Sequence, residues 1–126
     1  MTTQFLTDEN GRTVVAIIGS CEAALSCGGK PLTLLMPNTS EGASEKHLPV
    51  VERDGERLTA KVGSVFHPMS EDHSIGWVYL ETAKGGQLHR LCPDEEPVAE
   101  FRLAPDDDPV AVYAYCNLHG LWKTEL

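Results

Sequence analysis

Positive charge is scarce in this sequence. Ten lysine and arginine residues stand against nineteen aspartate and glutamate residues, which gives a net charge of −9 over 126 residues. Nucleic acids and anionic membranes bind surfaces that are rich in lysine and arginine, so this balance argues against either as a partner. It also means that an anionic substrate would have to be attracted by a local positive charge.

Long apolar runs are absent as well. No stretch approaches the roughly 20 apolar residues that a membrane-spanning helix needs. Residues 1–9 have neither the basic start nor the apolar core of an export signal. The remaining composition, 41% hydrophobic and 23% charged, is ordinary for a globular domain. We therefore expect a cytoplasmic protein of one domain with a small appendage.

Cysteine is limited to Cys21, Cys27, Cys92 and Cys116. Two disulfides are conceivable, but the missing export signal favours free thiols or a metal ligand. We expect no role for the first three cysteines. Cys116 differs because His119 follows three positions later, and a tight turn can direct both side chains at one metal ion. A buried thiol beside a capping histidine is the alternative interpretation.

Helical periodicity is almost absent, and short alternating runs recur between turns. They cover residues 58–62, 75–80, 87–91, 99–103 and 110–115, the last of these being the final strand expected. Asp54-Gly55 is a hairpin signal. This pattern predicts an all-β fold, an antiparallel β-sandwich.

The run 75–80 alternates along its whole length. Its odd-numbered residues are Ile75, Trp77 and Tyr79, and its even-numbered residues are Gly76, Val78 and Leu80. Because side chains alternate across a strand, each set is expected to share one face.

The first third of the chain differs from the rest. Residues 13–18 are apolar and β-branched and end at Gly19, which predicts a buried strand, and residues 31–36 form a second apolar piece. Residues 38–44 have the polar, glycine- and serine-containing composition of a linker. We therefore predict a small N-terminal β unit over residues 1–37 and the main domain over 38–126.

Four of the five histidines lie at element edges or in loops. If His47, His67, His73 and His119 converge with Cys116, they offer five ligands. Structural zinc usually takes four ligands, whereas iron is commonly held with one octahedral position vacant. The most economical arrangement has an imidazole equator, an axial thiolate and an open site opposite the thiolate.

Glu45 and Lys46 directly precede His47. Lys46 could supply the local positive charge that the acidic chain lacks, and could orient a proton-donating water. Glu45 could fill the sixth position when the iron is oxidised. An exposed charged pair at a strand start is the alternative.

Residues 45–52, 61–69, 73–77 and 115–122, in this order, resemble the superoxide reductases of the desulfoferrodoxin and neelaredoxin family. The resemblance implies an immunoglobulin-like antiparallel β-sandwich with a small N-terminal β appendage. It also implies one mononuclear non-haem iron per chain, with Glu45 and Lys46 as a mobile pair near the open position. The implied iron ligands are His47, His67, His73, His119 and axial Cys116.

The resemblance further implies one-electron reduction of superoxide to hydrogen peroxide. An external donor such as rubredoxin would reduce the iron again, and the protein would be a homodimer. A non-catalytic metalloprotein, either an electron carrier or a zinc-stabilised binding module, is the rival interpretation. Dismutation of superoxide is a third.

The sequence departs from the family in two places. Two-iron members hold a second iron in an N-terminal desulforedoxin-like domain, with a Cys-x-x-Cys pair and a later Cys-Cys pair. Here residues 6–11 stand in place of the first pair and Cys27-Gly28 in place of the second. We therefore expect a degenerate N-terminal unit without metal, which persists as scaffold or dimer contact. Ser74 stands where the family commonly has tyrosine, which affects packing or water access.

Overall fold

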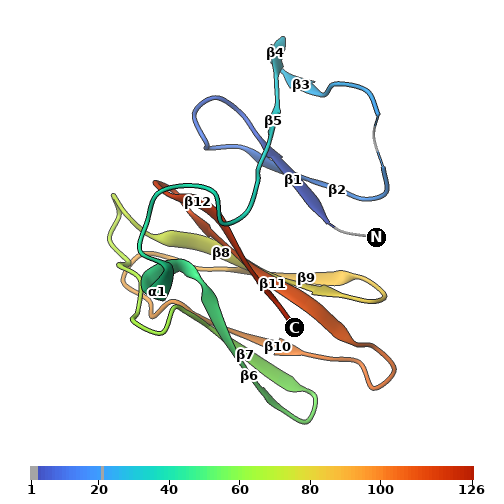
Figure 1. Cartoon of the computed structure of the whole chain (residues 1–126), viewed down its shortest axis with the longest axis vertical. Helices are drawn as coiled ribbons and strands as arrows, with labels where there is room; N and C mark the ends of the chain where they lie inside the picture. Colours follow the sequence, from blue (N-terminus) through green and yellow to red (C-terminus); the bar gives the residue numbers. More distant parts are fainter. Residues whose placement is uncertain (1–2, 21) are drawn as a thin grey trace. The chain divides into compact units, whose positions relative to one another are not determined.

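The computed structural model describes residues 3–20 and 22–126, so Cys21 lies outside the described residues. The chain divides into two compact units, Met1–Met36 and Pro37–Leu126. Strands dominate both units, and every strand pairing is antiparallel (Figure 1). None of the described helices is long and apolar enough to cross a membrane.

The described residues of the first unit form five short strands. In its three-stranded sheet, β1 (Gln4–Thr7) lies between β2 (Val14–Ile17) and β5 (Thr33–Leu34), and β3 (Ser26–Cys27) pairs with β4 (Lys30–Pro31). The strand predicted within 13–18 is present as β2, but its predicted burial is wrong. The β2 side chains are half-buried or exposed, and Ile18 is 98% exposed. An apolar β-branched run favours a strand, whereas burial also requires a second layer.

The second unit is a sandwich of two sheets. One sheet has the order β10-β7-β6 and the other β12-β11-β8-β9. Their bounds are β6 (Pro49–Asp54), β7 (Arg57–Val62), β8 (Ile75–Thr82), β9 (Gly86–Arg90), β10 (Val98–Arg102), β11 (Pro109–Cys116) and β12 (Gly120–Glu125). This arrangement confirms the all-β, immunoglobulin-like sandwich.

The core forms where alternate side chains of both sheets meet. Leu58, Ala60 and Val62 of β7 face it from one sheet, and Val112 and Ala114 of β11 from the other. Cys116 continues the β11 series and is fully buried. The alternation of apolar residues therefore places the thiol on the inner face of the sandwich.

Two expectations about the strands are wrong. The final strand is β12 (Gly120–Glu125), not residues 110–115, and Cys116 is the last residue of β11. Strand β12 was missed because Leu121 and Trp122 are both buried, which breaks the alternation. Ile75 joins the core together with Val78 instead of sharing a face with Trp77.

The position of Ile75 has a geometric cause. Tyr115 pairs with Trp77, but the next residue, Cys116, pairs with Ile75, so the register shifts at Gly76. Such a bulge turns the preceding residue to the other face. Ile75 and Cys116 therefore end up together on the core face.

The short helix α1 (Ser44–His47) was not predicted, and a neighbouring loop holds it in place. The Glu45 carbonyl accepts hydrogen bonds from the Val65 amide (2.9 Å) and the Ser64 hydroxyl (3.2 Å). Gly63 makes this approach possible, because a Cβ atom there would lie 2.6 Å from the Glu45 oxygen and 2.9 Å from the Leu48 oxygen.

Gly63→Ala should therefore destabilise the protein. Both atoms that the new methyl group would meet belong to backbone, which cannot rotate away, so we expect a loss of about 1–3 kcal/mol in urea unfolding. Gly85→Ala is the control, since a Cβ atom there meets nothing within 4 Å. Equal stability of the two variants would contradict the close packing of α1 on this loop.

Candidate metal centre

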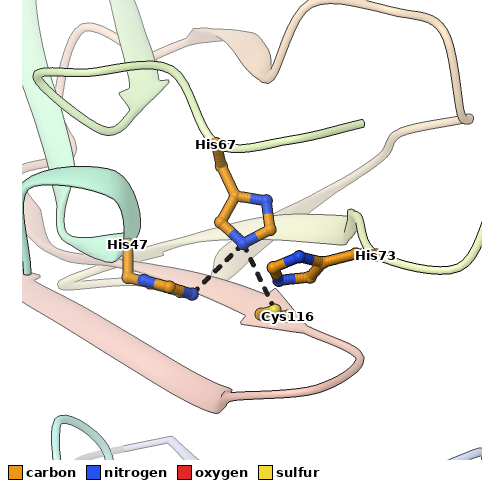
Figure 2. Close-up of side chains that lie close together, drawn as sticks. All are labelled: His47, His67, His73 and Cys116. Atoms are coloured by element: carbon orange, nitrogen blue, oxygen red, sulfur yellow. Dashed lines mark hydrogen bonds between the residues drawn. The ribbon is translucent and has the colours of Figure 1, made fainter. Parts of the chain in front are cut away.

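Four potential metal ligands converge at one end of the sandwich. His47 ends α1, His67 and His73 lie in the loop between β7 and β8, and Cys116 ends β11. Their donor atoms all lie within 4.8 Å of one another. The His67 Nε2 atom is 3.1 Å from His47 Nε2 and 3.3 Å from Cys116 Sγ. Figure 2 shows the three rings and the sulfur pointing toward one another.

Backbone carbonyls orient two of the rings. His47 Nδ1 lies 2.8 Å from the Ala43 oxygen, and His67 Nδ1 lies 2.7 Å from the Pro68 oxygen. A carbonyl only accepts hydrogen bonds, so in each ring Nδ1 carries the proton and donates it. In the neutral rings the Nε2 lone pairs are then left for the shared centre, as in metal-binding histidines whose other nitrogen is fixed.

Burial keeps the imidazoles neutral. It lowers the pKa of His67 to about 4, against the opposite effect of the Pro68 carbonyl, and His47 and His73 lower the pKa of His67 further. Burial is also the main cause that lowers the pKa values of His47 and His73. Neutral imidazole is the form that binds metal.

The thiol responds to burial in the opposite direction. Burial raises the pKa of Cys116, and hydrogen bonds from the Leu118 and His119 amides partly offset this shift. A thiol binds metal as thiolate. Metal binding would therefore release the Cys116 proton, which couples affinity to pH.

The donor set fits a cation better than it fits a self-contained polar cluster. His73 Nε2 is a buried side-chain nitrogen without a hydrogen-bond partner. The Nε2 atoms of His47 and His67 face each other at 3.1 Å although both rings have their protons on Nδ1. Unpaired buried acceptors are costly, and a metal ion would satisfy all of them together.

His119 lies beside this group. Its ring centroid is 5.0 Å from that of His47 and 5.3 Å from that of His73. The group within 4.8 Å comprises the other four residues. Trp122 Nε1 donates a hydrogen bond to the His119 carbonyl (3.1 Å), and the Ser40 hydroxyl donates to the same oxygen.

A model of the desulfoferrodoxin family matches residues 39–125. The chain belongs to the desulfoferrodoxin family. It is 36% identical to the desulfoferrodoxin of Clostridium acetobutylicum over 118 residues, which cover 94% of this chain and 92% of the relative. It is 42% identical to a desulfoferrodoxin homolog of Archaeoglobus fulgidus over 113 residues, with 88% and 87% covered.

Both units have a counterpart in one solved structure. The crystal structure of the superoxide reductase from Treponema pallidum matches with a TM-score of 0.88 and 36% identity. The match covers 99% of this chain and 100% of that chain. The protein therefore shares its fold with that structure over nearly its whole chain.

Glu45 and Lys46 are exposed residues of α1. The positive charge of Lys46 is among the causes that lower the pKa values of His47 and His73. Lys46 is therefore near enough to act electrostatically on the centre. The alternative interpretation placed this charged pair at the start of a strand, but the pair lies in the helix α1.

Sequence reasoning missed two residues that contact His47. The Trp122 ring stacks on the His47 ring, with centroids 4.8 Å apart and planes at 28°. Gly42 lies so close that a Cβ atom there would be 3.1 Å from His47 Cε1 and 3.3 Å from Trp122 Cζ2. The sequence signal available was the proximity of Gly42 and Trp122 to the predicted ligands His47 and His119.

The other described cysteines do not join the centre. Cys27 in β3 and Cys92 are exposed free thiols. Both lie outside the four-donor group.

Gly42→Ala should weaken metal binding. The new methyl group would press on the His47 ring, which Trp122 prevents from moving away, and disturbing such a supporting contact typically costs about 10–100-fold in metal affinity. Titration of the metal-free protein with Co²⁺, followed by visible absorbance, measures the effect.

Gly85→Ala, between β8 and β9, is the control for this experiment, because a Cβ atom there meets nothing within 4 Å. We expect it to bind Co²⁺ like the unmodified protein. If Gly42→Ala binds equally well, the contact with His47 does not control the geometry of the centre.

Proposed function

We propose that this chain is a superoxide reductase. The observation that supports this most is the convergence of three neutral imidazoles and one thiol on a single point, in a chain of the desulfoferrodoxin family. The reaction consumes one superoxide anion, one electron and two protons, and it produces one hydrogen peroxide molecule. The protein must therefore attract an anion and deliver protons beside the metal.

The metal in this proposal is one mononuclear non-haem iron per chain. His47, His67, His73 and Cys116 would hold it, with His119 as the fifth ligand. When bound, iron supplies the one-electron redox chemistry, which zinc lacks. Burial lowers the pKa values of His47, His67 and His73 and keeps these imidazoles neutral, so the thiolate is the main negative charge that the four residues add.

Lys46 is the residue that we assign to anion attraction. On a chain with a net charge of −9, a local ammonium group is needed to draw in superoxide. Its charge already acts on His47 and His73. An exposed ammonium group can also orient a water molecule that donates a proton. Glu45 would be a further ligand of the oxidised metal.

The remaining proposals concern partners and organisation. We propose an external electron donor such as rubredoxin, a cytoplasmic location and a homodimer. Residues 1–37 would form the metal-free unit and residues 38–126 the iron-binding domain. The exposed apolar side chains of Ile18 and Leu34 make this N-terminal unit a candidate dimer contact.

Iron content and rapid mixing with superoxide test the function. We expect about one iron per chain, a visible thiolate-to-iron absorption in the oxidised protein, and one hydrogen peroxide formed per reduced centre. Stopped-flow absorbance after mixing the reduced protein with superoxide follows the reaction. Oxygen release without an external reductant would instead indicate dismutation.

A zinc-stabilised, non-catalytic protein is the second candidate. The number of converging donors favours this candidate, because structural zinc sites usually take four ligands and four residues have donor atoms within 4.8 Å of one another. Stoichiometric, tightly bound zinc in protein produced with iron available, together with no reaction with superoxide, would support it over the reductase.

Lys46→Ala should slow the reaction with superoxide by about tenfold, because local positive charge raises the association rate of an anion. The rate of the unmodified protein should fall with ionic strength more steeply than that of the variant. Lys46→Arg keeps the charge and should restore most of the rate.

Lys84→Ala is the matched control. It removes the same charge from an exposed lysine that forms an ion pair with Asp106 and does not appear among the charges acting on the site histidines. If both alanine variants slow the reaction equally, net charge and not the position of Lys46 controls the rate.

A further inference from the structure

The ligands differ in how the protein holds them. His47 and His67 each donate a hydrogen bond to a backbone carbonyl, and Cys116 is fixed within β11. His73 lies in the loop before β8, and its Nε2 has no hydrogen-bond partner. The direction of its ring therefore depends on how its backbone is held.

Within its own loop, the His73 backbone is tied to Ser70. The Ser70 amide donates to the His73 oxygen (3.0 Å), and the His73 amide donates to the Ser70 hydroxyl oxygen (3.2 Å). These bonds shape the turn. Both partners lie within the loop, so they do not fix the distance between His73 and Cys116.

Asn117 provides that connection. Its side-chain oxygen accepts a hydrogen bond from the Ser74 amide (3.0 Å), and its side-chain nitrogen donates to the Asp72 carbonyl (2.8 Å). The Asn117 amide also donates to the Ser74 carbonyl (3.3 Å). One side chain thus holds the residues on both sides of His73 and directly follows Cys116 in the sequence.

The exposure of Asn117 argues against a packing role. The residue is exposed, so its side chain adds little to the core, yet both ends of its amide are used on backbone groups. The sheet pairing of β11 with β8 ends at Cys116 and Ile75. The Asn117 side chain extends this connection into the loop that carries His73.

We propose that Asn117 is a positioning residue of the metal centre: its amide fixes the distance and direction of His73 relative to Cys116. The proposal deepens the proposed function and rests on its metal-binding part. It predicts an effect on the metal that exceeds any effect on folding.

Asn38 offers a matched control within the same unit. Its side-chain oxygen accepts from the Lys123 amide (2.8 Å), and its side-chain nitrogen donates to the Lys123 carbonyl (3.1 Å). Asn38 is therefore the same kind of two-sided clamp, on β12 instead of on a ligand loop. Its φ of 63° disfavours alanine, so Asn38→Ala should destabilise the fold at least as much as Asn117→Ala.

The test compares the full chain with its Asn117→Ala and Asn38→Ala variants, each loaded with Fe³⁺ or Co²⁺. The readouts are the thiolate-to-metal absorption, the rate of metal transfer to a chelator, and the thermal unfolding of the metal-free proteins. We expect Asn117→Ala to lose metal about 10–100-fold faster, with an altered absorption band. Asn38→Ala should keep the band and the release rate of the unmodified protein.

The isosteric pair Asn117→Asp and Asn38→Asp repeats the comparison if an alanine variant does not fold. Each keeps the acceptor oxygen and loses the donor nitrogen, so Asn117→Asp should release metal faster than Asn38→Asp. Equal bands and release rates in the matched pair would overturn the positioning role alone. If the unmodified protein binds neither metal, the proposed function fails together with this inference.

Discussion

The site depends on a thiol that lies on the inner face of a sandwich. Alternation along β11 puts Val112, Ala114 and Cys116 in the core. Cys116 is the last residue of the strand, and its Sγ atom lies 3.3 Å from His67 Nε2. A thiol that ended the strand facing outward could not meet the histidine loops. The register shift at Gly76 also matters for the site. It pairs Cys116 with Ile75, which follows His73 by two residues.

Burial makes this arrangement costly without a cation and favourable with one. It disfavours the thiolate and the charged imidazoles, as the raised pKa of Cys116 and the lowered pKa of His67 show. The Nε2 atoms of His47 and His67 then face each other although both rings have their protons on Nδ1, and His73 Nε2 has no hydrogen-bond partner. A bound metal removes this penalty, so we expect metal binding and stability of this unit to be coupled.

The sequence predicted the sandwich better than the site. Period-two runs identified β7 to β11 and the hairpin at Asp54-Gly55, because alternation reports directly which face a strand buries. It failed where tertiary contacts decide: α1 is held by the loop around Gly63, β12 buries two consecutive residues, and β2 lacks the burial that its composition suggested. The convergence of His47, His67 and His73 was expected mainly through the family resemblance, since no local rule brings three separate segments together.

Support for the centre is concentrated in the turn between β11 and β12. This turn and the strand residues that flank it carry Cys116, Asn117 and His119, and Trp122 follows on β12. Trp122 stacks on His47, while Asn117 holds the backbone on both sides of His73. Because this turn carries Cys116 and also contacts His47 and the backbone around His73, a shift of its backbone is transmitted to all three of these side chains together. This shared support explains how a candidate site collected from separate segments can keep one geometry although His67 and His73 lie in a long irregular loop.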